Sequence, residues 1–175
     1  MFSAGSETSS TTIDWAMAEM LKHPRILKKA QDEVRQVFDK KGCVDEVYIH
    51  ELKYLKCVIK ESLRMHPPIP LLLPRECHDP CAIDGYDIPA RTRVMVNAWA
   101  HGRDPGCWKE AESFKPERYL DINSADYKGN NFEYMPFWRR KEDMPWNVVR
   151  PCKRRAPACD VSLPFRLVVA SRNET

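Results

Sequence analysis

The feature that most constrains this fold is an apolar helical stripe that stops at a pair of prolines. Residues 50–66 repeat apolar side chains at the spacing of one helix face. Pro67 and Pro68 end the helix, because proline lacks a backbone N–H donor and disfavours helical backbone in the residue before it. The stripe is expected to be buried and to comprise Leu52, Leu55, Val58, Ile59 and Leu63.

Two further helices are expected ahead of this stripe. The first lies within residues 5–23. It begins close to the first residue and without a cap, so we expect the chain to be a fragment. The second begins with Pro24 at a permitted first-turn position and ends at Gly42. The apolar positions are Ile13, Met17, Met20 and Leu21 in the first helix, and Ile26, Leu27, Ala30, Val34, Val37 and Phe38 in the second.

The chain after Pro68 is expected to form short strands and loops. Residues 81–90 are typical of β-strands joined by a turn, and residues 91–100 alternate at Val94 and Val96. Residues 114–120 are predicted to be a loop and residues 121–131 a polar surface connector. With 175 residues the chain is long enough for one domain with a sizeable core, and the expected fold class is mainly α with small β pieces.

Composition excludes several classes of protein. No apolar run is long enough to cross a bilayer, and there is no basic-then-apolar leader. The seven cysteines are irregularly spaced, which argues against a secreted disulfide framework and for a reducing compartment. Cys77-His78-Asp79-Pro80-Cys81 is only weakly similar to a metal ligand set, since no second Cys/His pair follows at zinc spacing. A turn with two unrelated thiols is the preferred interpretation.

Positive charge is concentrated at the C-terminal end. Residues 138–175 contain nine Lys/Arg and four Asp/Glu, a net charge of +5, so the other residues, with 19 and 21, carry −2 of the total of +3. The regular pattern of residue types also ends at Phe137. A basic segment can bind nucleic acid or an acidic membrane surface. Here it lacks regularly interleaved aromatics, so we expect no nucleic-acid partner.

Glu61 and Arg64 form the first candidate site. They are three residues apart and therefore share a helix face. An isolated pair of this kind is usually a surface salt bridge that contributes little to stability. A second arginine, Arg118 in the Pro-Glu-Arg segment at 116–118, could complete a charge network with Glu61. A buried network of this kind fixes geometry more than it adds stability.

A second candidate site is the segment "AGSET", residues 4–8. One interpretation is a frayed helix start, weakened by Gly5, with Glu7 near the positive end of the helix dipole. The other is a groove where a small ligand approaches the backbone and where Glu7 and Thr8 relay protons. These five residues alone favour the first interpretation.

Five motifs in one order give the chain a family resemblance. They are "AGSETSST", "KESLR", "HPPIPLLLPREC", "NAWAHGRDP" and "FKPERYL". Together they resemble the C-terminal part of a cytochrome P-450, a haem-thiolate monooxygenase, and most of all the plant microsomal A-type group. The resemblance covers residues 1–137. It implies an incomplete cytochrome P-450 fold that runs from the oxygen-activation helix to the loop before the haem site.

The resemblance implies roles for individual residues. The positions of the oxygen-activation groove are Ala4, Gly5, Glu7 and Thr8. The structural triad that supports the haem-binding core is Glu61, Arg64 and Arg118, and the partner of a haem propionate is Arg75. The positions that line the substrate pocket are Ser3, Ile69, Leu71 and Leu72.

The resemblance also implies cofactors and partners for the intact family. These are haem, a small apolar substrate and an NADPH-dependent reductase, at the endoplasmic reticulum membrane. One oxygen atom of dioxygen would enter the substrate and the other would leave as water.

The expected haem loop does not follow Phe137. The family pattern there is F-G-x-G-R-x-x-C-x-G, and its cysteine thiolate is the axial iron ligand. Residues 138–151 contain no cysteine, and Cys152 and Cys159 lie too far along, among basic residues and prolines. As written, the chain has no axial cysteine, so we expect it to bind neither a metal ion nor haem stably.

A one-base insertion at Trp138 accounts for the missing loop. In the original frame, each codon consists of the last two bases of one present codon and the first base of the next. Trp138 before arginine, Met144 before proline and Trp146 before asparagine then specify glycine, cysteine and glycine, whichever synonymous codons are used. These three fall at the first glycine, the cysteine and the last glycine of the loop pattern.

The resulting hypothesis divides the chain in two. Residues 1–137 are a C-terminal cytochrome P-450 fragment, and residues 138–175 are an out-of-frame, disordered basic tail. The chain is then a truncated, inactive form, cytoplasmic or degraded. The alternative is a non-enzymatic interaction fragment whose basic tail binds an acidic partner or a membrane surface.

Overall fold

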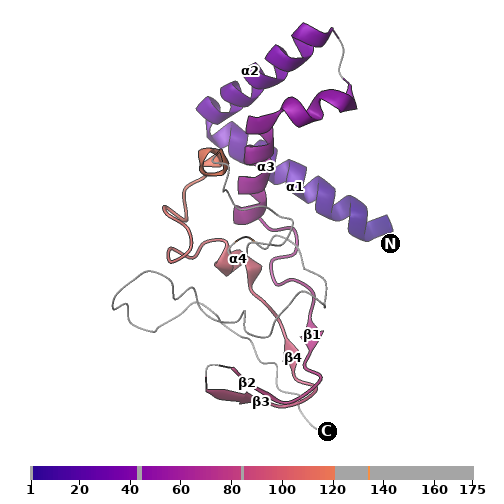
Figure 1. Cartoon of the computed structure of the whole chain (residues 1–175), viewed down its shortest axis with the longest axis vertical. Helices are drawn as coiled ribbons and strands as arrows, with labels where there is room; N and C mark the ends of the chain where they lie inside the picture. The colour runs from indigo at the N-terminus through magenta and orange to yellow at the C-terminus, as the bar shows by residue number, and fades with distance from the viewer. Residues whose placement is uncertain (1, 43–44, 84, 121–133, 135–175) are drawn as a thin grey trace. The chain divides into compact units, whose positions relative to one another are not determined.

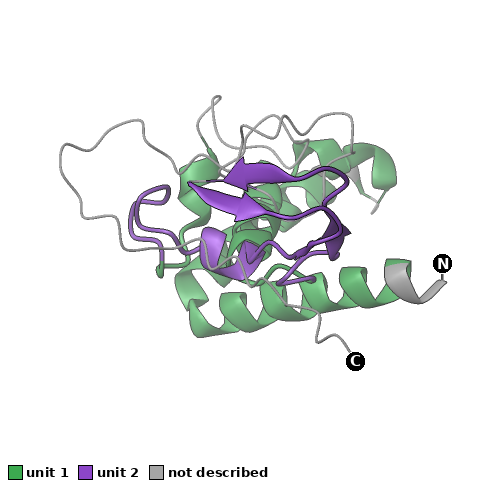
Figure 2. Cartoon of the chain, turned by 90° about the horizontal axis from the view of Figure 1, so that it is seen from below, with its two compact units in different colours: residues 1–68, 112–126 green, residues 69–111, 127–175 purple. Residues whose placement is uncertain are grey.

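The computed structural model describes residues 2–42, 45–83, 85–120 and 134. It divides into two compact units, shown in green and purple in Figure 2. Unit 1 consists of residues 1–68 and 112–126, and unit 2 consists of residues 69–111 and 127–175. Residues 138–175, expected to be a separate tail, lie outside the described residues, and so does the expected connector at 121–131.

Unit 1 begins with two long helices joined at a proline. Helix α1 spans Phe2–Lys22 and helix α2 spans Pro24–Lys41 (Figure 1). Pro24 occupies the first turn of α2, where a missing N–H leaves no hydrogen bond unmade. Gly42 ends α2 with a left-handed φ of 72°, and its N–H donates to the carbonyl of Phe38 at 2.9 Å. Both predicted boundaries are confirmed.

The predicted helix at 50–66 begins later than expected. Residues Glu46–Glu51 form a 3₁₀ helix, η1, and helix α3 spans Lys53–Met65. The side chain of Asp45 starts η1 by accepting the N–H of Val47 at 3.0 Å. The helix ends at Met65, just before the two prolines, as predicted. The segment predicted to be a loop at 114–120 contains a second 3₁₀ helix, η2, at Pro116–Tyr119.

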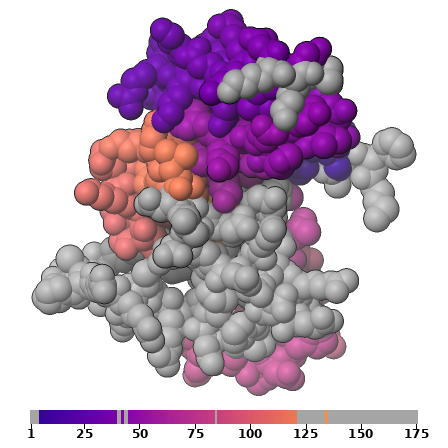
Figure 3. Space-filling view, turned by 45° about the horizontal axis from the view of Figure 1, so that its top comes forward, coloured from indigo at the N-terminus to yellow at the C-terminus, as the bar shows by residue number. Residues whose placement is uncertain are grey.

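The core of unit 1 lies where α1, α2 and α3 meet. Its buried members come from all three helices and from the segment before η2, and they are Met20, Ile26, Ala30, Tyr54, Val58, Met65 and Phe114. The predicted stripe is buried at Leu52, Val58 and Leu63. Leu55 is half-buried and Ile59 is 40% exposed, which corrects their expected burial. Figure 3 shows the outer surface of these helices in indigo to purple.

The described part of unit 2 contains two short antiparallel pairs and one short helix. Strand β1 (Arg75–Glu76) pairs with β4 (Arg93–Val94), and β2 (Cys81–Ile83) pairs with β3 (Tyr86–Ile88). Gly85, with a φ of 84°, permits the tight turn between β2 and β3. The alternation at 91–100 gives only a two-residue strand, because Asn97 caps helix α4 (Ala98–His101) and accepts the N–H of Ala100 at 3.0 Å.

Among the described residues, no helix is both long enough and apolar enough to cross a membrane. The described elements are mostly helical with a few short strands, so the expected fold class is confirmed.

Two glycines of unit 1 allow a test of the backbone alone. An added Cβ would meet no atom within 4 Å at Gly5, inside α1, or at Gly42, whose φ is left-handed. We expect Gly5→Ala to raise the free energy of unfolding by about 0.5–1 kcal/mol, because alanine is the better helix former. Gly42→Ala should lower it by about 1–2 kcal/mol, the usual penalty of left-handed backbone for an L-residue. Urea unfolding followed by circular dichroism measures both changes in the free energy of unfolding. Two changes of equal sign would contradict the assignment of helical backbone to Gly5 and left-handed backbone to Gly42.

Candidate functional site

The carboxylate of Glu61 is the centre of the main polar site. Glu61 lies on α3, and Arg64 follows one turn later on the same helix. The side chains of both residues are 0% exposed. Arg64 Nε donates to Glu61 Oε2 at 2.8 Å and Arg64 Nη2 donates to Glu61 Oε1 at 2.8 Å. This bidentate, fully buried pair excludes the interpretation of Glu61 and Arg64 as a surface salt bridge.

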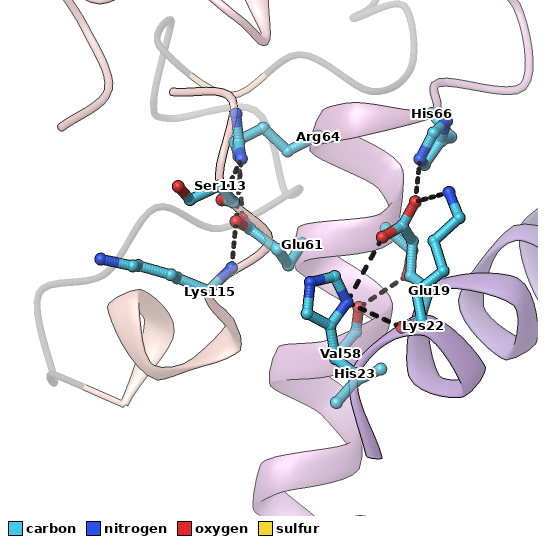
Figure 4. A network of polar contacts seen from close by, with 10 residues as sticks. Glu19, Lys22, His23, Val58, Glu61, Arg64, His66, Ser113 and Lys115 are labelled. Atoms are coloured by element: carbon cyan, nitrogen blue, oxygen red, sulfur yellow. Dashed lines mark hydrogen bonds and ion pairs between the residues drawn. The ribbon is translucent and has the colours of Figure 1, made fainter. Parts of the chain in front are cut away.

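A distant segment completes the site. Arg118 Nε donates to Glu61 Oε1 at 3.0 Å, and the N–H of Lys115 donates to the same oxygen at 2.9 Å. The carbonyl of Ser113 accepts from the guanidinium groups of both arginines at 3.2 Å. Figure 4 shows Glu61, Arg64, Ser113 and Lys115 around this contact. The structure therefore brings Glu61, Arg64 and Arg118 together, with one carboxylate beside two positive charges.

The same carboxylate influences a neighbouring phenol. Tyr119, the last residue of η2, is 5% exposed. Burial raises the pKa of Tyr119 far above its ordinary value, and the negative charge of Glu61 adds to this effect. Tyr119 therefore stays neutral and acts as a packing residue beside the charge network.

A second acidic residue anchors the start of α3, and the sequence analysis missed it. Glu33 on α2 accepts the N–H of Tyr54 at 2.7 Å and the N–H of Leu55 at 2.9 Å. The residue before α3, Leu52, offers no side-chain cap of its own. Because the first N–H groups of a helix have no partner within it, Glu33 supplies the cap from another helix. No local sequence signal identifies a cap that is 21 residues distant.

The phenol of Tyr54 ties the start of α3 to η2. Tyr54 Oη donates to Glu117 Oε1 at 3.0 Å, and Lys29 Nζ donates to the same oxygen at 3.3 Å. Burial raises the pKa of Tyr54, and the hydrogen bond to the Glu117 carboxylate raises it further. The motif residue Glu117 thus has structural contacts of its own beside Arg118.

A third acidic residue, also missed, links α1 to the end of α3. Glu19 is 5% exposed and its Oε1 accepts from Lys22 Nζ at 3.0 Å and contacts His66 Nε2 at 3.1 Å (Figure 4). The ring of His66 stacks on Trp15 with centroids 3.9 Å apart and planes 2° apart. Burial opposes the charged form of Glu19, but the hydrogen bonds from Lys22 and His66 outweigh it, so the pKa of Glu19 is lowered.

The residues of the expected oxygen-activation groove lie on α1. The helix continues through Gly5, and the hydroxyls of Ser9 and Thr12 donate to the carbonyls of Gly5 and Thr8 at 2.9 and 2.8 Å. Glu7 is exposed and lies beyond the first turn of α1, which contains no acidic residue. The side chain of Ala4 lies outside the described residues, and the groove stays a prediction.

The expected pocket and propionate residues are divided between the units. Ser3 belongs to α1, and its side chain is outside the described residues. In unit 2, Ile69 is half-buried, Leu71 is 46% exposed and Leu72 is buried at a left-handed φ of 52°. Backbone strain of this kind in a bulky residue is found where the surrounding structure imposes it. Arg75 is half-buried on β1, and its role stays a prediction.

The two thiols of the 77–81 turn are close together. Cys77 Sγ lies 3.7 Å from Cys81 Sγ, so their description as unrelated is wrong. In the part of the chain that the structure describes, no group of three or more His, Cys, Asp and Glu side chains could hold a metal ion.

Comparison with known proteins identifies the class of this chain. Residues 1–137 match the family Cytochrome P-450, and the chain belongs to that family. It is 66% identical over 137 residues to salviol synthase of Salvia pomifera and 64% identical over 137 residues to tabersonine 16-hydroxylase 2 of Catharanthus roseus. Each match covers 78% of this chain but 27% of the relative, so the chain spans about a quarter of the relatives' length.

Solved structures agree with this assignment. A zebra fish cytochrome P-450 structure with progesterone matches with a TM-score of 0.66 and 33% identity, over 78% of this chain and 30% of that one. The fold is therefore part of the cytochrome P-450 fold. Family membership implies haem, small-molecule substrates and a reductase partner for intact members.

The Glu61 network predicts that the same change, glutamate to glutamine, has very different effects on the free energy of unfolding at two positions. Glu61→Gln removes the negative charge that the buried Arg64 and the half-buried Arg118 share, so we expect it to lower the free energy of unfolding by about 3–5 kcal/mol. The matched control is Glu117→Gln in the same network segment, whose side chain is 37% exposed and whose amide can still accept from Tyr54. We expect the control to cost at most about 1 kcal/mol. Urea unfolding at pH 7 measures both, and similar losses would refute the buried network.

The lowered pKa of Glu19 predicts a pH dependence with a definite sign. A carboxyl with a depressed pKa in the folded state stabilises the fold above its unfolded pKa, ordinarily 4.5, and loses this contribution as the pH falls through the folded value. At pH 7, Glu19→Gln should lower the free energy of unfolding by about 1.5–3 kcal/mol, as expected for hydrogen bonds to a charged group. The difference from wild type should shrink below pH 4.5. Glu7→Gln, an exposed change on the same helix, is the control, and a pH-independent difference for Glu19→Gln would be the contrary result.

Proposed function

We propose that this chain derives from a plant microsomal monooxygenase and is itself an inactive form that lacks the axial thiolate. The observation that carries the proposal is the position of the cysteines. The family match ends at Phe137, and there is no cysteine between Cys107 and Cys152, the interval in which the haem loop is expected. A haem-thiolate enzyme cannot operate without that ligand.

Two of the described thiols are poor replacements for the axial ligand. Cys57 is buried on α3, and burial raises its pKa, which favours the neutral thiol over the thiolate that a metal requires. Burial also raises the pKa of Cys77, whose sulfur is occupied by contacts with Asp79 and Cys81. Cys57 and Cys77 therefore do not fit a thiolate-ligated haem, and we propose that the chain binds none stably.

The surface of α1 supports descent from a longer protein. Large apolar side chains on this helix are exposed, at 62% for Ile13, 46% for Met17 and 65% for Leu21. Burying apolar surface stabilises a fold by roughly 25 cal/mol per Å². Ile13, Met17 and Leu21 contribute little of this stabilisation in the present chain, because their side chains are exposed to water. In a relative of which the match covers 27%, further segments could cover them.

For the intact protein we propose the roles that the family resemblance implies. Glu61, Arg64 and Arg118 would support the haem-binding core, which their buried geometry favours. Arg75 would pair with a haem propionate. The oxygen-activation groove would be Ala4, Gly5, Glu7 and Thr8, with Glu7 and Thr8 moving protons through a carboxylate and a hydroxyl. The substrate pocket would include Ser3, Ile69, Leu71 and Leu72.

The proposed setting follows from the same family. The intact enzyme would insert one oxygen atom of dioxygen into a small apolar molecule, with electrons from an NADPH-dependent reductase at the endoplasmic reticulum membrane. The present chain would remain in the cytoplasm or be degraded. The comparisons do not favour the alternative of an interaction fragment with a basic tail.

A chimeric enzyme tests both the inactivity and the shifted frame. The corresponding C-terminal part of salviol synthase is replaced by residues 1–175, encoded either as found or with the first base of the Trp138 codon removed. We expect the characteristic absorbance band of reduced, CO-bound, thiolate-ligated haem only from the second chimera. Unaltered salviol synthase is the positive control, and changing the restored cysteine at position 144 to serine should abolish the band.

The two chimeras separate the two parts of the proposal. A band from the chimera that retains the present reading frame would show that the chain needs no restored cysteine, and the inactivity would be refuted. If base removal restores no band, the explanation by a shifted frame fails.

A further inference from the structure

Two thiols of unit 2 lie within reach of one another. Cys77 follows strand β1 and Cys81 opens strand β2, and their sulfur atoms are 3.7 Å apart. Both are free thiols in this structure. A disulfide requires its sulfur atoms to approach to about 2.05 Å, so the two sulfur atoms must come closer before a bond can form.

The backbone holds the two residues at this spacing. The N–H of Cys77 donates to the carbonyl of Thr92 at 2.9 Å, and the N–H of Arg91 donates to the carbonyl of Cys77 at 2.7 Å. Cys81 pairs with Ile88 in the β2–β3 ladder. The backbone of each cysteine is held by a different set of hydrogen bonds. The approach of the two residues is therefore imposed by the fold and not only by the three residues that connect them.

The surroundings of the two thiols differ. Cys77 is 2% exposed and its S–H donates to the carbonyl of Asp79 at 2.9 Å, whereas Cys81 is half-buried. Burial raises the pKa of the Cys77 thiol, and its contact with Cys81 contributes in the same direction. A reagent in solution therefore reaches Cys81 first, while Cys77 stays neutral and protected.

We propose that Cys77 and Cys81 form a reversible intramolecular disulfide, in which Cys81 is attacked first and Cys77 resolves the intermediate. The oxidant is a small-molecule disulfide such as oxidised glutathione. The Cys81 thiolate attacks one sulfur of the oxidant, the S–S bond breaks, and one glutathione thiolate leaves. The sulfur of Cys77 then attacks the Cys81 sulfur as its S–H proton is lost, the S–S bond between Cys81 and glutathione breaks, and the second glutathione thiolate leaves and takes up that proton. Two protein thiols are oxidised, two glutathione thiols are formed, and the protons of the cysteines pass to them.

The proposal is compatible with a reducing compartment. Disulfides in such compartments are transient and responsive to redox conditions rather than permanent. The bond would join the end of β1 to the start of β2, across the turn at residues 78–80. It requires no haem, so it stands independently of the proposed function.

Thiol mapping of the complete chain tests the proposal without any substitution. The chain is equilibrated in glutathione buffers of graded ratio, quenched with acid, alkylated and digested, and the peptides carrying each cysteine are quantified by mass spectrometry. We expect the Cys77–Cys81 disulfide to form with an equilibrium constant at least about tenfold larger in native buffer than in urea, because the fold holds the thiols together. Equal constants in the two solvents would overturn the proposal.

Single substitutions test the order of attack. Cys77→Ser should accumulate a glutathione adduct on Cys81, since nothing resolves it, whereas Cys81→Ser should leave Cys77 as a free thiol. Equal adduct formation on the two remaining thiols would refute the assigned order. Cys57→Ser and Cys107→Ser are the matched controls, because Cys57 lies on α3 and Cys107 contacts Asp104. Loss of the Cys77–Cys81 disulfide in either control would also count against the proposal.

Discussion

The buried carboxylate of Glu61 is the contact on which unit 1 depends. It is fully enclosed and accepts hydrogen bonds from Arg64, from Arg118 and from the backbone N–H of Lys115. A buried charge is costly unless it is paired and hydrogen-bonded, so the segment at 113–118 must lie against α3 for the charge to be tolerated. The network therefore determines where that segment runs, more than it adds net stability.

Acidic residues from three separate elements meet α3. Glu33 on α2 caps its first turn, Glu117 on η2 accepts from Tyr54, and Glu19 on α1 contacts His66 just beyond its last turn. The apolar core at Met20, Val58 and neighbouring residues supplies burial, which is not directional. The carboxylates add direction, because a hydrogen bond requires a specific donor at a specific distance.

The sequence predicted those features of the fold that depend on neighbouring residues. Pro24, Gly42 and Pro67 mark helix boundaries through their own backbone chemistry, and the spacing of Glu61 and Arg64 placed them on one face. Contacts between distant segments were harder to predict from the sequence, and Arg118 was indicated only as a possible partner of Glu61. The cap from Glu33 had no local signal, and Ile59 is exposed although it has the spacing of the buried stripe. The approach of Cys77 to Cys81 depends on hydrogen bonds from Arg91 and to Thr92, which no short motif encodes.

The cap from Glu33 has a consequence for how α3 can move. The helix is held near its beginning by Glu33, along its length by Glu61 and just past its end by Glu19. Sliding by one turn, about 5.4 Å along the axis, would separate Glu33 and Glu19 from their donors at the two ends of α3. It would also separate Glu61 from Arg118 and from the N–H of Lys115. These contacts oppose sliding of α3 along its axis. A force applied at either end of α3 would therefore move the helix as one rigid body.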